Sequence, residues 1–212
     1  MSVLHRIAFY QGRRDELPNQ ELARDLAASA DRDGIRELAD NLKNKDRSVR
    51  SDCLKVLYEI GYIDPSLIAD YVGEFLALLR SRNNRMVWGG MIALSTISAL
   101  RAADIWSRID DVIKAVDEGT LITVVSGVKV LAMVASASEA YEQRLFPVLL
   151  KQLQSCTPRD VPMHAESILP AIDDGNRCEF LAVLRSREAE LSASQAARLR
   201  KVIRQVEKVP PA

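Results

Sequence analysis

The chain has 212 residues, of which 48% are hydrophobic and 27% charged, and its formal net charge is zero. This composition is typical of a soluble globular protein and excludes a chain that is disordered over its whole length. Because the net charge is zero, the chain as a whole is not attracted to nucleic acid or to a membrane surface.

The first 34 residues are predicted to form capping helices. The opening stretch MSVLHRIAFYQGRR contains Arg6, Arg13 and Arg14 and no unbroken apolar core, so we expect no signal peptide. Cysteines 53, 156 and 178 are far apart in the sequence, which indicates free thiols in a reducing cytoplasm. The uncharged run between Arg85 and Arg101 is fifteen residues long. A membrane span needs roughly 20 residues, so this run is predicted to be a core helix.

From residue 35 onward, apolar residues recur with a period of 37 residues. Within each period they are spaced three and four apart, which is the pattern of one helical face. Two of the recurring columns are Ile35, Val72, Ile109, Phe146, Val183 and Leu54, Met91, Val128, Ala165. The pattern predicts first helices at about 35–44, 71–81, 108–117, 144–155 and 176–190, and second helices at about 48–61, 85–100, 121–136 and 162–172.

A column of capping residues lies between the two helices of each unit: Asp46, Asn83, Thr120 and Thr157. Their side-chain oxygens can accept a hydrogen bond from the first turn of the helix that follows. We therefore expect a helix boundary within about three residues of Asp46, Asn83 and Thr120, and no strand over residues 35–155. Pro170 should end or kink its helix. Residues 191–208 should form a final capping helix.

The stretch IRELADNLKNKDRSVRSDCLKVLYEIG, with Asp46 and the Leu57/Ile60 stripe, resembles a HEAT repeat. LFPVLLKQLQS, with Pro147 near its start, resembles the first helix of another. The chain is thus similar, over about residues 35–190, to HEAT-repeat proteins of the armadillo-like α-solenoid group. The resemblance implies an all-α, right-handed superhelix of about five helix pairs in one domain over residues 1–212. It also implies a non-catalytic scaffold without cofactors that binds a protein or peptide on its concave surface.

The second helices of such a fold usually line the concave surface, and their outward positions give the candidate partner-binding residues. These are Asp52, Lys55, Glu59, Trp88, Ile92, Val125, Lys129 and Met133. Trp88, Ile92 and Val125 would form an apolar patch, and such patches often mark binding sites. Alternatively, Trp88 packs between neighbouring repeats.

Small residues in the column Cys53, Gly90, Gly127, His164 are expected to let one second helix approach the next. The alternative is that Gly89 and Gly90 only make the helix flexible.

An enzymatic alternative rests on IWSRIDDVI, which is similar to a Trp-x-x-x-Asp motif of HEAT-like alkylpurine DNA glycosylases. Trp106 and Asp110 would be the matching residues, one turn apart on one helical face. Asp110 also suits the first turn of a helix electrostatically, whatever its function. Nucleic acid is therefore a possible but not a favoured partner. His164 and Glu166 are not adjacent, and His5 provides no second His-Glu pair of the kind that HEAT-repeat iron hydroxylases use, so we predict no metal site.

Overall fold

A computed structural model of the chain describes residues 2–208. Over this range the secondary structure is α-helix and 3-10 helix, with no strand, as the sequence predicts. No helix in the described part is long and apolar enough to cross a membrane. The chain divides into two compact units, Met1–Gly127 and Val128–Ala212.

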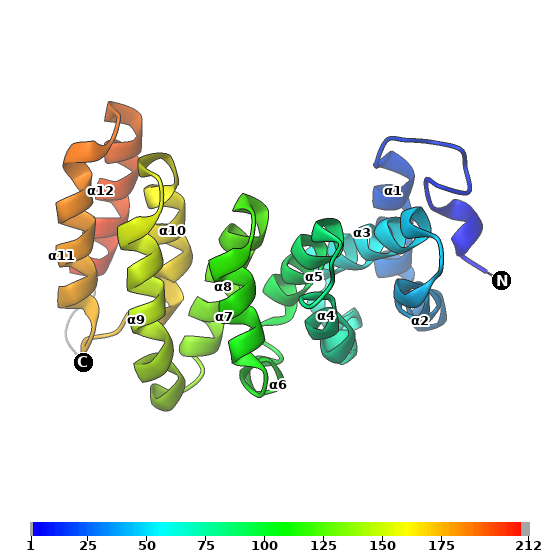
Figure 1. The fold of residues 1–212 in the computed structure, drawn as a ribbon, viewed down its shortest axis with the longest axis horizontal. Helices are drawn as coiled ribbons and strands as arrows, with labels where there is room; N and C mark the ends of the chain where they lie inside the picture. The colour runs from blue at the N-terminus through cyan, green and yellow to red at the C-terminus, as the bar shows by residue number, and fades with distance from the viewer. Residues whose placement is uncertain (1, 209–212) are drawn as a thin grey trace. The chain divides into compact units, whose positions relative to one another are not determined.

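The first unit contains two layers of helices (Figure 1). Helices α1, α3 and α5 pack in succession, and α2 and α4 pack against α3 and α5 respectively. The predicted first helices are α2, α4 and α7, and the predicted second helices are α3, α5 and α8. The bounds are α1 Leu17–Ser29, α2 Arg32–Asp40, α3 Arg47–Ile63, α4 Val72–Leu78, α5 Asn84–Ile97, α6 Ala102–Trp106 and α7 Ile109–Glu118. The boundary between the two units falls within α8 Leu121–Ala135. Short 3-10 helices cover Leu4–Arg6, Asn41–Lys43, Pro65–Leu67 and Ala69–Tyr71.

The apolar columns of the sequence form the core of these helices. Ile35, Phe75 and Met91 are fully buried, and Val72 is the half-buried exception in its column. Burying an aliphatic or phenylalanine side chain contributes about 1.5–3 kcal/mol. The burial of the repeating columns therefore stabilises the packing of neighbouring helices.

Helix starts follow the predicted capping residues closely. The Asp46 carboxylate accepts from the amides of Ser48 at 2.7 Å and Val49 at 3.4 Å, and α3 begins at the next residue. Asn83 accepts from the amide of Arg85 at 3.0 Å before α5, and α8 begins directly after Thr120. Thr157 is different, because its hydroxyl donates to Asp160 at 2.7 Å and caps no helix. The prediction of a side-chain cap at Thr157 is therefore wrong.

In the second unit, helices α9 and α10 contact each other, and α11 and α12 pack beside them (Figure 1). The bounds are α9 Glu139–Ser155, α10 Val161–Ile168, α11 Arg177–Arg187 and α12 Ala193–Glu207, with 3-10 helices at Pro158–Asp160, Leu169–Ala171 and Glu188–Glu190. Helix α10 ends two residues before Pro170, as predicted. Helix α9 begins earlier than expected because Ser138 caps it, so Pro147 lies inside the helix rather than near its start.

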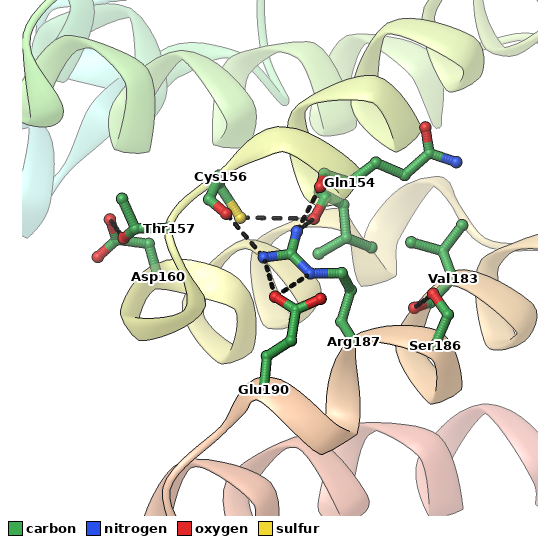
Figure 2. Close-up of polar contacts among 9 residues, drawn as sticks. Gln154, Cys156, Thr157, Asp160, Val183, Ser186, Arg187 and Glu190 are labelled. Atoms are coloured by element: carbon green, nitrogen blue, oxygen red, sulfur yellow. Dashed lines mark hydrogen bonds and ion pairs between the residues drawn. The ribbon is translucent and has the colours of Figure 1, made fainter.

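Arg187 makes several polar contacts within the second unit (Figure 2). Only 7% of this residue is exposed. Its guanidinium donates to the carbonyl oxygens of Leu153 and Cys156, each at 2.8 Å, and to Glu190 at 3.0 Å. The last carbonyls of a helix have no partner within the helix. Arg187 of α11 therefore closes the carboxyl end of α9.

The two glycines of α5 permit two different close contacts. A Cβ atom at Gly90 would lie 2.9 Å from Leu78 Cβ and 3.1 Å from the carbonyl oxygen of Phe75, both in α4. A Cβ atom at Gly89 would lie 2.5 Å from Leu54 Cδ2 in α3. The close approach of second helices was thus assigned to the wrong glycine: Gly89 admits the neighbouring second helix, and Gly90 admits the partner helix of its own pair.

Candidate functional site

The N-terminal segment, residues 8–16, covers the beginning of the predicted binding surface on α3. The backbone amide of Phe9 donates to the Asp52 carboxylate at 2.8 Å. The Lys55 ammonium lies 2.8 Å from a Glu16 oxygen and 2.7 Å from a Glu59 oxygen. Burial alone would lower the pKa of Lys55, but the hydrogen bonds to Glu16 and Glu59 raise it overall. These contacts fasten the segment to α3.

The expectation of an open surface is therefore wrong for two of the candidate residues. Lys55 is 7% exposed and Ile92 is 9% exposed, so neither side chain reaches far into solvent. Lys55 is buried because the N-terminal segment, whose position the repeat pattern does not specify, folds over it. Asp52 and Glu59 are partly exposed but already have partners within the chain.

Three aromatic residues form what we call the aromatic strip: Tyr58 and Tyr62 of α3 and Trp88 of α5. The ring centroids of Tyr58 lie 6.3 Å from Tyr62 and 6.4 Å from Trp88. Tyr58 is buried, Trp88 is half-buried and Tyr62 is 61% exposed. Trp88 borders a small hollow that Ser51, Lys55 and Arg85 also line. The strip thus presents partly exposed aromatic surface on two helices that pack against each other.

A groove of about 570 Å³, which we call the arginine groove, adjoins the strip. It is bounded by the N-terminal segment, the start of α1 and the amino-terminal ends of α3 and α5. Ser51 and Arg85 line both the groove and the hollow beside Trp88. The charged residues of its lining are Arg13, Arg14, Arg47, Arg85, Asp15, Glu16 and Asp52.

Every carboxylate of the arginine groove has a partner. Asp15 is held by Arg13, with an Nη2–Oδ1 distance of 2.9 Å, and this hydrogen bond lowers the pKa of Asp15. Glu16 binds Lys55, and Asp52 accepts from the amide of Phe9. The guanidinium groups of Arg14, Arg47 and Arg85 have no hydrogen-bond or carboxylate partner within residues 2–208. The groove therefore combines satisfied acids with uncommitted arginines.

The remaining partner-binding candidates lie on α8. Val125 is half-buried and belongs to the first unit. Lys129 is exposed and Met133 half-buried, and both belong to the second unit. Their participation in one surface with Trp88 remains a prediction.

Trp106 and Asp110 do not lie on one helical face as predicted. Helix α6 ends at Trp106, and α7 begins at Ile109 after a break at Ser107 and Arg108. Trp106 is half-buried and Asp110 is exposed. Spacing along one continuous helix therefore no longer supports the resemblance to a glycosylase motif.

The described residues contain no cluster of three or more His, Cys, Asp or Glu side chains that could hold a metal ion. Burial raises the pKa of Cys53 to about 12, so its reactive thiolate form is suppressed. His164 is 1% exposed and its Nδ1 has no hydrogen-bond partner within residues 2–208. Burial lowers the pKa of His164, and the Asp160 charge opposes this effect. His164 is therefore a neutral residue of the core.

Tyr62 and the three uncommitted arginines were missed by the sequence analysis. A signal for two of them is present in the sequence. Arg47 directly follows the capping residue Asp46, and Arg85 lies two residues after the capping residue Asn83. The first turn of a helix favours acidic side chains because of the helix dipole. A basic residue in the first turn of the second helix of two successive repeats indicates a role other than helix stability.

Comparisons with solved structures identify the fold. No protein-family model matches the sequence, and no curated protein matches it. A designed armadillo repeat protein in complex with the peptide (KR)4 has a TM-score of 0.69 at 12% identity, with 88% of this chain and 86% of that chain covered. A computationally designed armadillo repeat protein for modular peptide recognition has a TM-score of 0.66 at 12% identity, covering 91% and 94%. An engineered protein has a TM-score of 0.60 at 19% identity, covering 97% and 98%. The chain therefore has the armadillo- and HEAT-like α-solenoid fold.

Proposed function

We propose that this protein is a non-catalytic repeat scaffold in the cytoplasm that binds a peptide segment of a protein partner along the aromatic strip. The carrying observation is that Trp88 and Tyr62 are partly exposed on packed helices and that Trp88 borders a small hollow. Tyrosine and tryptophan are frequent anchors of protein interfaces, since they offer a large contact area with few rotatable bonds. Glu59 and Val125, which belong to the same unit as the anchors, would extend the contact beyond them.

The fold comparison supports a peptide over a small molecule as the ligand. Two of the similar structures are armadillo repeat proteins designed for or solved with peptides. At 12% identity this likeness transfers no individual contact, so the choice of residues rests on the exposure and geometry of the aromatic strip.

The proposal can be tested by selecting binders from a library of random peptides displayed on phage. The affinity of selected peptides is then measured for wild type, Trp88→Ala and Tyr62→Ala. Truncating an interface anchor costs about 2 kcal/mol or more, so we expect the affinity to fall roughly thirtyfold for Trp88→Ala. Leu100→Ala is the matched control, because Leu100 is 54% exposed and lies outside the strip. Peptides that bind Trp88→Ala as tightly as wild type would remove the aromatic strip from the proposal.

The alternative, an alkylpurine DNA glycosylase, makes a separate prediction. Trp106 and Asp110 are not buried in the core, so a catalytic role for them is testable directly. Wild type and Asp110→Asn would be incubated with a DNA duplex that carries a methylated purine. Base release by wild type that Asp110→Asn abolishes would support the alternative, and absence of release by wild type would eliminate it.

A further inference from the structure

We propose that the arginine groove binds an oxyanion, namely the phosphate group of a phosphorylated peptide. The inference deepens the proposed function, because it assigns a chemical class to the ligand at one end of the aromatic strip. The binding of the anion itself stands on the groove alone.

The groove offers hydrogen-bond donors that the fold does not use. Arg14, Arg47 and Arg85 line it without a partner among residues 2–208. Two buried polar side chains line it as well. Ser51 is 9% exposed, and its hydroxyl makes no hydrogen bond with a described residue. Asn19 is 1% exposed; its oxygen accepts from the amide of Ala8 at 2.9 Å, while its amide nitrogen donates to no described residue. Among the described residues, neither of these two atoms is both sealed from solvent and without a partner, so both donors are accessible to a ligand in the groove.

The groove carries an excess of positive charge. Four arginines and three carboxylates line it, and Lys55 is shared between Glu16 of the lining and Glu59 outside it. An excess of one positive charge therefore remains, and the side chains of Arg14, Arg47 and Arg85 have no carboxylate partner among the described residues. The amino-terminal ends of α3 and α5 both lie at the groove and add to the positive potential.

The nearby Arg50, in contrast, uses its side chain to stabilise the fold. Arg50 lies one turn beyond Arg47 on α3, and its Nη1 donates to the carbonyl oxygen of Asn44 at 2.6 Å. Arg50 therefore supports the turn before α3. Arg47 and Arg85 make no such contact and occupy first-turn positions where a positive charge is unfavourable. A bound anion would compensate this cost.

The size of the groove indicates that the phosphate is carried by a larger molecule. About 570 Å³ is within the range of sites for drug-sized ligands and far exceeds the space for a phosphate ion. Ser51 and Arg85 connect the groove to the hollow beside Trp88. A phosphorylated peptide side chain can thus enter the groove while its neighbouring residues contact the aromatic strip.

The anion site is tested with inorganic phosphate on the full chain. The Nε–Hε signals of the arginine side chains are followed by nuclear magnetic resonance during titration, with chloride at equal ionic strength as the reference. We expect saturable shifts for Arg14, Arg47 and Arg85. Arginine–phosphate hydrogen bonds are charge-assisted, so Arg47→Gln and Arg85→Gln should each weaken binding roughly tenfold. Arg24→Gln, an equal charge change on an exposed residue of α1 outside the groove, should leave it unchanged.

Three results would overturn the site. These are shifts that do not saturate or that chloride reproduces, equal effects of Arg24→Gln and Arg47→Gln, and acetate binding as tight as phosphate binding. A phosphoserine peptide then tests the carrier, and it should bind more tightly than free phosphate, with the gain lost in Trp88→Ala. Equal affinity, or tighter binding of an oligonucleotide, would contradict a peptide carrier. Because inorganic phosphate requires no peptide, failure of this site and failure of the proposed function are distinguishable.

Discussion

The arginine groove and the second unit use the same side chain in opposite ways. In the second unit, Arg187 closes the end of α9, and Arg198 donates to Glu166 with an Nε–Oε1 distance of 2.6 Å. Arg200 likewise donates to Glu188, with an Nε–Oε1 distance of 2.6 Å. In the groove, the side chains of Arg14, Arg47 and Arg85 line the cavity and have no partner among the described residues. The difference indicates that the first set serves stability and the second set serves a ligand.

Removing Arg187 should have the largest effect on stability. Arg187→Met leaves the carbonyls of Leu153 and Cys156 and the Glu190 carboxylate without their donor, so we expect the free energy of unfolding to fall by about 3–5 kcal/mol. Urea unfolding followed by circular dichroism measures the change. The control is Arg185→Met, which removes an exposed ion pair with Glu207 and should cost less than about 1 kcal/mol. Similar losses in both variants would contradict the structural role of Arg187.

Gly90 tests whether α5 is a rigid support for the aromatic strip. Gly90→Ala would push Cβ against Leu78 and the Phe75 carbonyl, so we expect a loss of about 1–3 kcal/mol. Gly73→Ala in α4 meets nothing within 4 Å and should not destabilise, because alanine is the better helix former by about 1 kcal/mol. If Gly90→Ala stabilised the protein as well, Gly90 would serve flexibility rather than close packing.

His164 should make the stability of the protein depend on pH. Burial lowers its pKa in the folded state, so below about pH 6.5 the unfolded state binds more protons than the folded state. The free energy of unfolding should therefore fall as the pH decreases from about 6.5 toward the folded pKa. Urea midpoints between pH 7.5 and 5.5 should fall less for His164→Gln than for wild type. Identical slopes would show that His164 is not the group responsible.

The groove arginines should have the smallest effect on stability. Because Arg47 has no partner among the described residues and its charge opposes the helix dipole, Arg47→Gln should change the free energy of unfolding by less than about 0.5 kcal/mol. The same urea unfolding experiment measures it. A loss above about 1 kcal/mol would place Arg47 with the structural arginines and weaken the comparison between the two regions.

The sequence predicted the helices well because the signals are local. Asp46 and Asn83 mark the starts of α3 and α5, and the spacing of Ile35 and Leu38 predicts a buried face of α2. The two errors in the predicted helix starts each concern a single capping residue. Ser138 starts α9 early, and Thr157 donates its hydroxyl hydrogen to Asp160 instead of capping a helix.

The site was less predictable because it depends on contacts between distant residues. Phe9 and Asp52 are 43 residues apart, and their contact positions the N-terminal segment over α3. Neither the burial of Lys55 nor the groove beside it follows from the repeat pattern. Trp88 could be predicted from its residue type and its outward position on the helix. In the structure its side chain is half-buried beside Tyr58.

The most direct test of the central claim is to measure stability and peptide affinity on the same Trp88→Ala sample. Truncation of a fully buried tryptophan costs about 3–5 kcal/mol. Because Trp88 is only half-buried, we predict a loss of about 2 kcal/mol or less in the free energy of unfolding, together with the roughly thirtyfold loss of affinity for selected peptides. A loss of 3–5 kcal/mol with unchanged affinity of the folded protein would instead make Trp88 a core residue, and would contradict the assignment of the aromatic strip as the binding surface.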